Sequence, residues 1–200
     1  MKTTRQSGFN LLELMFTLAV AAIVLGIGIP NMRDLVRNSR IAAETNDLVI
    51  GFHAGRSEAV KRRANVTLCA SSDPAAEAPS CSVNFAEGWV VFVDRNGNGE
   101  VDLDPDPDVS DAVIESHGPM RSGLNTTSES NYFAFAASGF GRDLPALGAR
   151  LFNLLICDSR GNDDLGDGRS AARLLAISST GRPQIFNTVA EVNARTGGCP

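Results

Sequence analysis

The residues able to do chemistry are few and are poorly spaced for a catalytic or metal site. His53 and His117 are the two histidines, and no two of the four cysteines form a Cys-x-x-Cys pair, so the spacing for zinc is poor. No Gly-x-Ser-x-Gly elbow, phosphate-binding loop or His-Glu-x-x-His motif occurs. We therefore expect no catalytic residue, no metal, no cofactor and no enzymatic activity. For His53 we expect a buried or half-buried structural role.

A group of oxygen-bearing side chains begins like a calcium-binding loop. The stretch Asp94–Gly99 (DRNGNG) has oxygen ligands at alternate positions and Gly at the sixth, but Pro105 stands at the twelfth position, where a bidentate Glu is expected. The Asn-Gly steps also supply the positive φ values of a tight hairpin turn. The turn is the favoured interpretation, and a weak calcium site in the loop Asp94–Asp108 is the alternative.

One ionisable residue, Glu13, lies within a long apolar segment. This segment runs over 19 residues from Leu11 to Ile29, which is long enough to cross a bilayer as a helix. A carboxylate there costs roughly 3 kcal/mol, whereas each of the eleven Leu, Ile, Val and Phe residues returns roughly 0.3–0.6 kcal/mol, so insertion remains favourable. Lys2 and Arg5 favour a cytoplasmic N-terminus, which sends the rest of the chain outward.

Glu13 has two interpretations. Either it snorkels at the membrane edge, or it pairs with a positive group that another subunit supplies, since ionisable residues in membranes usually have a partner. An ordinary secretory signal would have a shorter apolar core followed by a small-residue cleavage site. Here the small residue Gly8 precedes the apolar run and Pro30 closes it, so cleavage after the run is not expected.

The stretch Gly8–Leu14 (GFNLLEL) resembles the prepilin motif of type IV pilins and type II secretion pseudopilins. The resemblance implies that prepilin peptidase cuts after Gly8 and that Phe9 becomes an N-methylated terminus. It implies that Glu13 is the assembly carboxylate, paired with the N-terminal amine of a neighbouring subunit. It further implies a bacterial inner-membrane protein with one span, a periplasmic head and other pilin or pseudopilin subunits as partners. Asn10 stands where Thr is commoner in the family.

The rest of the chain reads as a helix followed by strands. We predict one long helix from about Phe9 to Arg63, bent at Pro30, which matches a usual kink position of the family. Apolar residues at helical spacing form its predicted buried stripe: Leu35, Ala42, Val49, Phe52 and Ala59. Gly51 and Gly55 weaken this helix by up to about 1 kcal/mol each relative to Ala.

Short β-like runs separated by turn residues follow from Asn65. The predicted strands are Val66–Cys69, Gly88–Asp94, Val113–His117, Tyr132–Ala136, Phe152–Cys157 and Arg173–Ser178. This order predicts an α+β fold, a long helix packed on an antiparallel β-sheet head, as in pilins. The predicted divisions are a leader (1–8), a transmembrane segment (9–30), an amphipathic helix (31–63) and a β-rich head (64–200).

If the head lies outside the cytoplasm, its cysteines are expected to form two disulfides. The sequence permits three pairings, of which the simplest joins Cys69 with Cys81 and Cys157 with Cys199.

Three further stretches resemble the subgroup named after pseudopilin H and the minor pilin FimT. Arg56–Arg62 with the following Val66–Cys69 is similar to the end of its long helix and its first strand. Gly88–Asp94 with Asn96–Gly99 is also similar to that subgroup, and Ser179–Arg182 resembles its closing turn. The resemblance therefore covers nearly the whole chain.

The resemblance implies a minor pilin or pseudopilin, a structural subunit that initiates or tips a type IV pilus or a type II secretion pseudopilus. A DNA-binding minor pilin for DNA uptake is the alternative, because some FimT-like proteins bind DNA through a Gly-Arg-x-Arg element. Here Gly181–Gln184 (GRPQ) lacks the second Arg, and a single phosphate contact from Arg182 would be weak. The net charge of −5 also argues against bulk binding of nucleic acid. A membrane-tethered domain without a fibre role is a third hypothesis, which Glu13 disfavours.

Overall fold

The computed structural model describes residues 10–81, 84–106, 110–144, 150 and 153–199. The chain divides into two compact units, Met1–Ser39 and Arg40–Pro200. The long helix α1, Leu11–Arg62, belongs to both units, so each part of it is described within its own unit.

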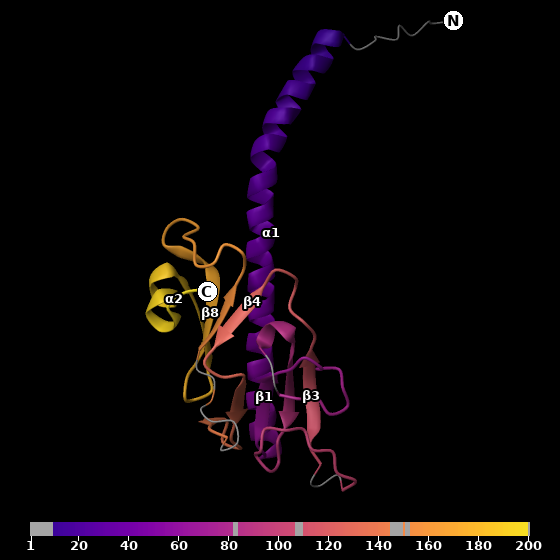
Figure 1. Ribbon diagram of the computed structural model, residues 1–200, viewed down its shortest axis with the longest axis vertical. Coiled ribbons are helices and arrows are strands. Elements are labelled where there is room, and N and C mark those ends of the chain that lie inside the picture. Colours follow the sequence, from indigo (N-terminus) through magenta and orange to yellow (C-terminus); the bar gives the residue numbers. More distant parts are fainter. Residues whose placement is uncertain (1–9, 82–83, 107–109, 145–149, 151–152, 200) are drawn as a thin grey trace, which may run out of the picture. The chain divides into compact units, whose positions relative to one another are not determined.

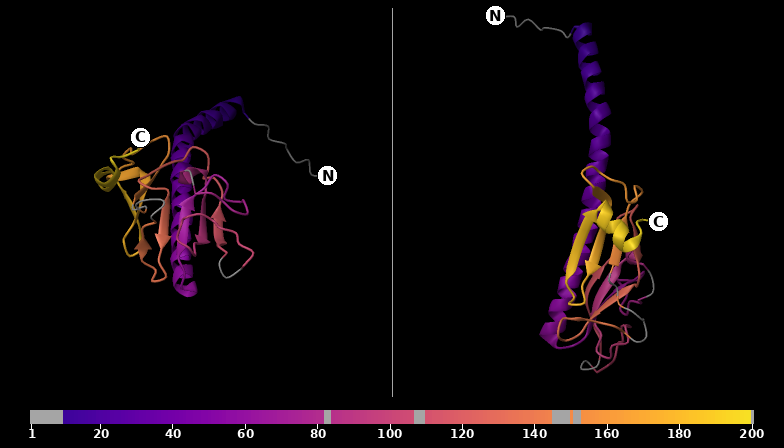
Figure 2. Two further views of the ribbon diagram at one scale, coloured as in Figure 1. Left: turned by 60° about the horizontal axis from the view of Figure 1, so that its bottom comes forward. Right: turned by 90° about the vertical axis from the view of Figure 1, so that its left-hand side faces the viewer.

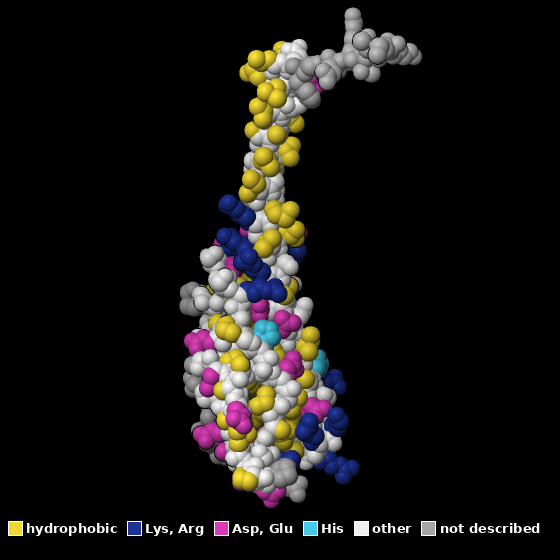
Figure 3. Space-filling view, turned by 90° about the vertical axis from the view of Figure 1, so that its right-hand side faces the viewer, with side chains coloured by type: hydrophobic (Ala, Val, Ile, Leu, Met, Phe, Trp, Pro, Cys, Tyr) yellow, Lys and Arg dark blue, Asp and Glu magenta, His cyan; other side chains and the backbone are white. Residues whose placement is uncertain are grey.

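The N-terminal unit contains the first part of α1. Asn10 caps the helix, because its side-chain Oδ1 accepts a hydrogen bond from Leu12 N at 3.3 Å. The helix continues through position 30 without interruption, and the predicted bend at Pro30 stays a prediction. Figure 3 shows hydrophobic side chains along this stretch of the surface.

The C-terminal unit combines the rest of α1 with two antiparallel sheets, which confirms the predicted α+β class but not the expectation of one sheet. The first sheet has the order β3-β2-β1-β5-β6 and the second has the order β4-β7-β8-β9. The strands are β1 Val66–Ala70, β2 Trp89–Val93, β3 Ala112–His117, β4 Asn125–Ser128, β5 Tyr132–Phe135, β6 Gly141–Arg142, β7 Asn153–Cys157, β8 Arg169–Ile177 and β9 Pro183–Thr188.

All six predicted strands are present to within a few residues, and α1 ends one residue before the predicted Arg63, whose φ of 55° is left-handed. Three strands were missed, namely β4, β6 and β9. A one-turn 3₁₀ helix, η1 (Phe85–Glu87), and a short helix, α2 (Val189–Thr196), were missed as well. The predicted residues Phe9 and Phe152 lie outside the described part of the chain.

Both sheets pack against the same segment of α1 (Figures 1 and 2). Ile41, Leu48, Phe52 and Ala59 of the helix share one buried cluster with residues of β1, β2, β5, β7 and β8. The central strands are buried on both faces, which explains their continuous apolar runs. Loops cover the outer face of the first sheet and α2 covers that of the second.

The predicted helical stripe was wrong in detail. Phe52 and Ala59 are fully buried, but Ala42 and Val49 are only half-buried and Leu35 is 63% exposed. The buried positions Ile41 and Leu48 each precede a predicted one by a single residue.

His53 is exposed, which contradicts its predicted burial. Its sequence neighbours Phe52 and Ala54 do not share its orientation, because adjacent helical residues point about 100° apart.

Candidate functional site

The first candidate site is the apolar part of α1 with its single carboxylate. The large side chains between Leu11 and Ile29 are exposed to between 44% and 75%. This helix is long and apolar enough to cross a membrane by length and composition. Apolar surface of this extent is stable in water only when a membrane or another protein covers it.

Glu13 lies in the first turn of α1 and is exposed. Its position near the N-terminal end of the helix dipole favours a negative charge. Within the described part of the chain, no group pairs with the Glu13 carboxylate. Its own chain therefore supplies no described counter-charge, and a partner would have to come from elsewhere.

Asn10 was noticed in the sequence only as a departure from the prepilin motif, and the structure gives it a role as the helix cap. An Asn directly before an apolar helical run is a capping signal that could have been recognised. The predicted processing residues Gly8 and Phe9 lie outside the described residues, so cleavage and methylation stay predictions.

Two disulfides are present in the C-terminal unit, Cys69–Cys81 and Cys157–Cys199. They join the same local pairs that the sequence analysis took as simplest. The first ties the loop after β1 onto the outer face of the first sheet, where Cys69 and Cys81 pack with Val90 and Phe92. The second ties the residue Cys199, beyond α2, to the end of β7.

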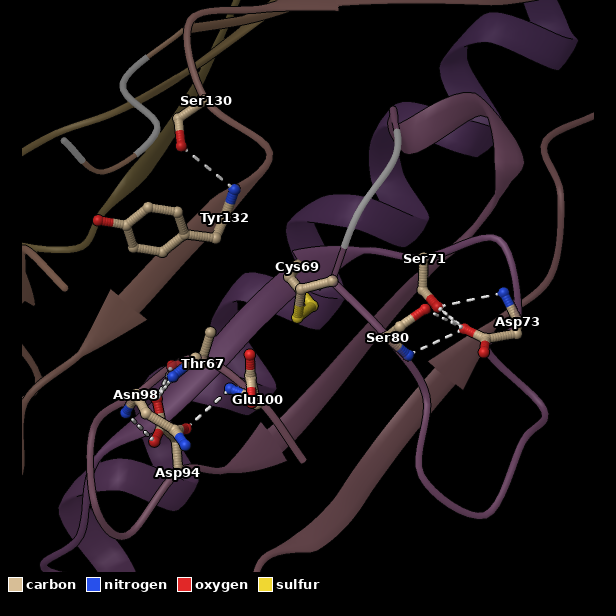
Figure 4. Close-up of a disulfide and its surroundings, with 12 residues drawn as sticks. Thr67, Cys69, Ser71, Asp73, Ser80, Asp94, Asn98, Glu100, Ser130 and Tyr132 are labelled. Atoms are coloured by element: carbon tan, nitrogen blue, oxygen red, sulfur yellow. Dashed lines mark hydrogen bonds between the residues drawn. A yellow bond between two sulfur atoms is a disulfide. The ribbon is translucent and has the colours of Figure 1, made fainter. Parts of the chain in front are cut away.

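Asp73 organises the loop closed by the first disulfide (Figure 4). Its Oδ1 accepts hydrogen bonds from Ser71 Oγ at 2.8 Å, Ser80 N at 2.9 Å and Ser80 Oγ at 3.1 Å. The backbone N–H of Ser80 and the hydroxyl of Ser71 lower the pKa of Asp73 below its usual value. The loop is therefore held at both ends, by a covalent bond and by a carboxylate.

The calcium-like loop is a hydrogen-bonded turn in which donors already occupy the central carboxylate. Asp94 is fully buried, and its oxygens accept hydrogen bonds from Thr67 Oγ1 at 2.8 Å and from Asn98 N and Gly99 N, both at 3.1 Å (Figure 4). Calcium requires six to eight oxygen ligands. The oxygens of Asp94 already accept hydrogen bonds from these donors, which favours the interpretation of this loop as a turn over its interpretation as a calcium site.

The turn is nevertheless not the tight hairpin that was predicted. β2 and β3 are joined by the whole stretch 94–111 rather than by an Asn-Gly pair. Asp111 closes this loop, because its carboxylate accepts hydrogen bonds from Arg95 N at 2.9 Å and from Asp102 N at 3.1 Å. Burial raises the pKa of Asp111 despite these bonds.

Arg182, the candidate DNA contact, is exposed in the turn between β8 and β9. Its backbone exchanges hydrogen bonds with Ser178, which forms the turn. Pro183 begins β9 directly after it, so the position of the missing second Arg belongs to an edge strand. Among the described residues of this turn (178–182), Arg182 is the one cation, and it is exposed.

The family model described as type II transport protein GspH matches residues 44–181. A search of curated proteins gives no match. Among solved structures, two crystal forms of the type IV minor pilin FimU of Pseudomonas aeruginosa are similar, both at 20% sequence identity. Their TM-scores are 0.47 and 0.46, and the alignments cover 74% and 72% of this chain and 89% and 91% of FimU. The family match spans more than half of the 200 residues, and the chain therefore belongs to the GspH family.

Proposed function

We propose that this chain is a minor pilin or pseudopilin that initiates or tips a type IV pilus or a type II secretion pseudopilus. In this role it is a structural subunit, anchored in the inner membrane before assembly, with a cytoplasmic N-terminus and a periplasmic head. The observation that carries the proposal is the exposed apolar surface of α1 from Leu11 to Ile29, interrupted by Glu13. Membership of the GspH family supports it.

The exposed segment suits two successive environments. In the membrane its apolar side chains replace contact with water by contact with lipid, and in a fibre they pack against the helices of neighbouring subunits. Glu13 is costly in both places unless a positive group is near. The N-terminal amine that prepilin peptidase would create at Phe9 of an adjacent subunit is such a group.

The test is the variant Glu13→Gln, which keeps the shape of the side chain and removes its charge. Leaving the neighbour's amine unpaired in apolar surroundings costs about 3–5 kcal/mol, so incorporation should fall at least about tenfold. Insertion, cleavage and folding of the head should be unchanged. The measurement is the amount of protein in sheared fibres, or crosslinked to other minor subunits, relative to its membrane pool.

Thr17→Ala is the matched control, because Thr17 lies one turn further on and donates its hydroxyl to Leu14 O of its own helix at 2.8 Å. This variant should leave the ratio unchanged. An unchanged ratio for Glu13→Gln would reject the pairing role and favour an extreme tip position or snorkelling. Complete absence of the wild-type chain from fibres and crosslinks would reject the fibre role itself.

A further inference from the structure

A second group of ionisable side chains, unrelated to Glu13, gathers where α1 meets the end of β3. Glu44 and Asp47 lie three residues apart on the helix, and His117 is the last residue of β3. One ligand atom from each of the three lies within 4.8 Å of the other two. The cluster thus joins two elements that are about 70 residues apart in the sequence.

Glu44 is the buried member, with only 4% of its surface exposed. Its Oε1 accepts a hydrogen bond from Arg121 N at 3.2 Å and lies 3.6 Å from Arg121 Nε. Among the described residues, none donates a hydrogen bond to the other oxygen, Oε2. The carboxylate of this buried residue therefore keeps one oxygen available to a further ligand.

His117 is held in the orientation that a metal ligand requires. Its Nδ1 donates to Gly118 O at 2.8 Å, which leaves the lone pair of Nε2 directed away from the backbone. Nε2 lies 3.7 Å from Asp47 Oδ2. The imidazole also stacks on Trp89, with ring centroids 5.2 Å apart and planes inclined by 4°. A backbone carbonyl bound to the second ring nitrogen is the usual support of a metal-binding histidine.

We propose that Glu44, Asp47 and His117 bind a divalent transition-metal ion, with Zn²⁺ as the reference ion and water as the fourth ligand. One imidazole with two carboxylates suits zinc better than calcium or magnesium, which take oxygen ligands alone. The four cysteines do not compete for the zinc ion, because all of them are paired in disulfides.

Charge and distance are consistent with this assignment. The two carboxylates and the Arg121 guanidinium leave one net negative charge, which a divalent ion would overcompensate by one. Tetrahedral zinc with ligands at about 2.0–2.1 Å has ligand atoms about 3.3 Å apart, so the 3.7 Å pair is nearly in place. The three ligand atoms lie within 4.8 Å of one another, so the remaining atom must move inward by up to about 1.5 Å. A bound metal ion would link α1 to β3, and neither disulfide links these two elements.

The chain provides its own reporters for the test. Trp89 is the sole tryptophan, so fluorescence reports changes next to His117. His53 and His117 are the two histidines, so their ring resonances distinguish the proposed ligand His117 from the control residue His53. Full-length protein in detergent, freed of any histidine tag, is titrated with ZnCl₂ against a chromophoric chelator. We expect one equivalent to bind, Trp89 fluorescence to change, and the ring resonances of His117 but not of His53 to shift.

Asp47→Asn and His117→Gln are the test variants and His53→Gln is the matched control. Asp47 is 41% exposed, so its substitution is expected to leave folding intact, as circular dichroism would verify. Each test variant should weaken zinc binding at least about tenfold, by analogy with losses at metal sites, and His53→Gln should leave it unchanged. Binding unaffected by both test variants, or shifts at His53 alone, would overturn the proposal. A failure of His117 to respond to zinc would also overturn it and leave the Asp47–His117 contact without a metal-binding role.

Discussion

The indole ring of Trp89 lies directly against the backbone of Gly51. A Cβ built on Gly51 would stand 2.6 Å from both Cη2 and Cζ3 of the ring, a separation that real Cβ atoms do not show. Trp89 is 1% exposed and stacked on His117, so it has no room to withdraw. Gly51 lowers the helix propensity of α1, but its lack of a side chain allows Trp89 of the first sheet to pack against the helix.

Gly51→Ala should destabilise the head by about 1–3 kcal/mol. The gain in helix propensity is about 1 kcal/mol, but overpacking against an immobile indole costs more than this gain. Gly55→Ala should cost less, since its Cβ would meet Phe135 and Val91 at 3.2–3.4 Å. Urea unfolding of the full-length protein in detergent measures both effects.

Gly26→Ala is the control for this pair, because no atom lies within 4 Å of a Cβ at that position of the same helix. It should leave the unfolding of the head unchanged. Equal stability of Gly51→Ala and the wild type would show that the Trp89 contact is softer than the geometry indicates.

Both disulfides should appear in non-reducing peptide maps of the protein, and the one closing the longer loop should contribute more stability. The sequence separations are 12 residues for Cys69–Cys81 and 42 for Cys157–Cys199. In the loop-closure model these correspond to about 3 and about 4 kcal/mol. Replacing each pair by serines and comparing urea midpoints checks the order. Four free thiols in protein isolated from the periplasmic face would refute both bridges.

The contribution of Asp73 to stability should depend on pH in a defined direction. Its folded pKa is lowered by Ser80 N and Ser71 Oγ, so folding favours the ionised form. The stabilisation is therefore fully present above the usual pKa of 3.8 and is lost as the pH falls through the folded value. Asp73→Ala should lower stability at neutral pH, and the difference from wild type should shrink in acid.

Glu77→Ala is the matched control in the same loop, because Glu77 is exposed and no described residue hydrogen-bonds to it. Its stability should follow the wild type across this pH range. An Asp73→Ala deficit that stays constant from neutral pH into acid would mean that the ionised carboxylate is not what stabilises the loop.

Processing gives a prediction at the N-terminus. Mass spectrometry of the mature protein should show loss of residues 1–8 and a methylated Phe9. Replacing Gly8 by a bulkier residue should leave uncut precursor in the membrane. An intact Met1, or cleavage beyond Pro30, in cells with active prepilin peptidase would contradict the prepilin interpretation.

The sequence predicted the elements whose signals are local and missed those whose signals depend on context. The central strands β1, β2, β5 and β7 are apolar runs, whereas β4 (Asn125–Ser128) is polar and β6 has two residues. Strand β9 begins with proline, which is tolerated because β9 is an edge strand. Helix α2 could have been found, since Thr188 with Glu191 three residues later is the sequence signature of a capping box, and Thr188 Oγ1 does accept a hydrogen bond from Glu191 N.

The partition into two sheets and the cluster around His117 could not be predicted. Strand pairing depends on contacts between residues that are distant in the sequence, and helical spacing alone does not show that one helix face contacts two sheets. Glu44 and Asp47 are three residues apart in α1 and therefore lie on the same helix face, which the sequence alone could show. The approach of His117 to them depends on the register of β3 against β2, where Trp89 pairs with His117.

The face of α1 between Ile41 and Ala59 serves both sheets, and this sharing governs how the head can come apart. Inner-face residues of both sheets meet the same helical side chains in one cluster, while the smaller clusters of described residues on the two outer faces include none from α1. Release of one sheet would expose helical surface on which the other depends. The head should accordingly unfold cooperatively in a single step, and a protease should meet either an intact head or a fully open one.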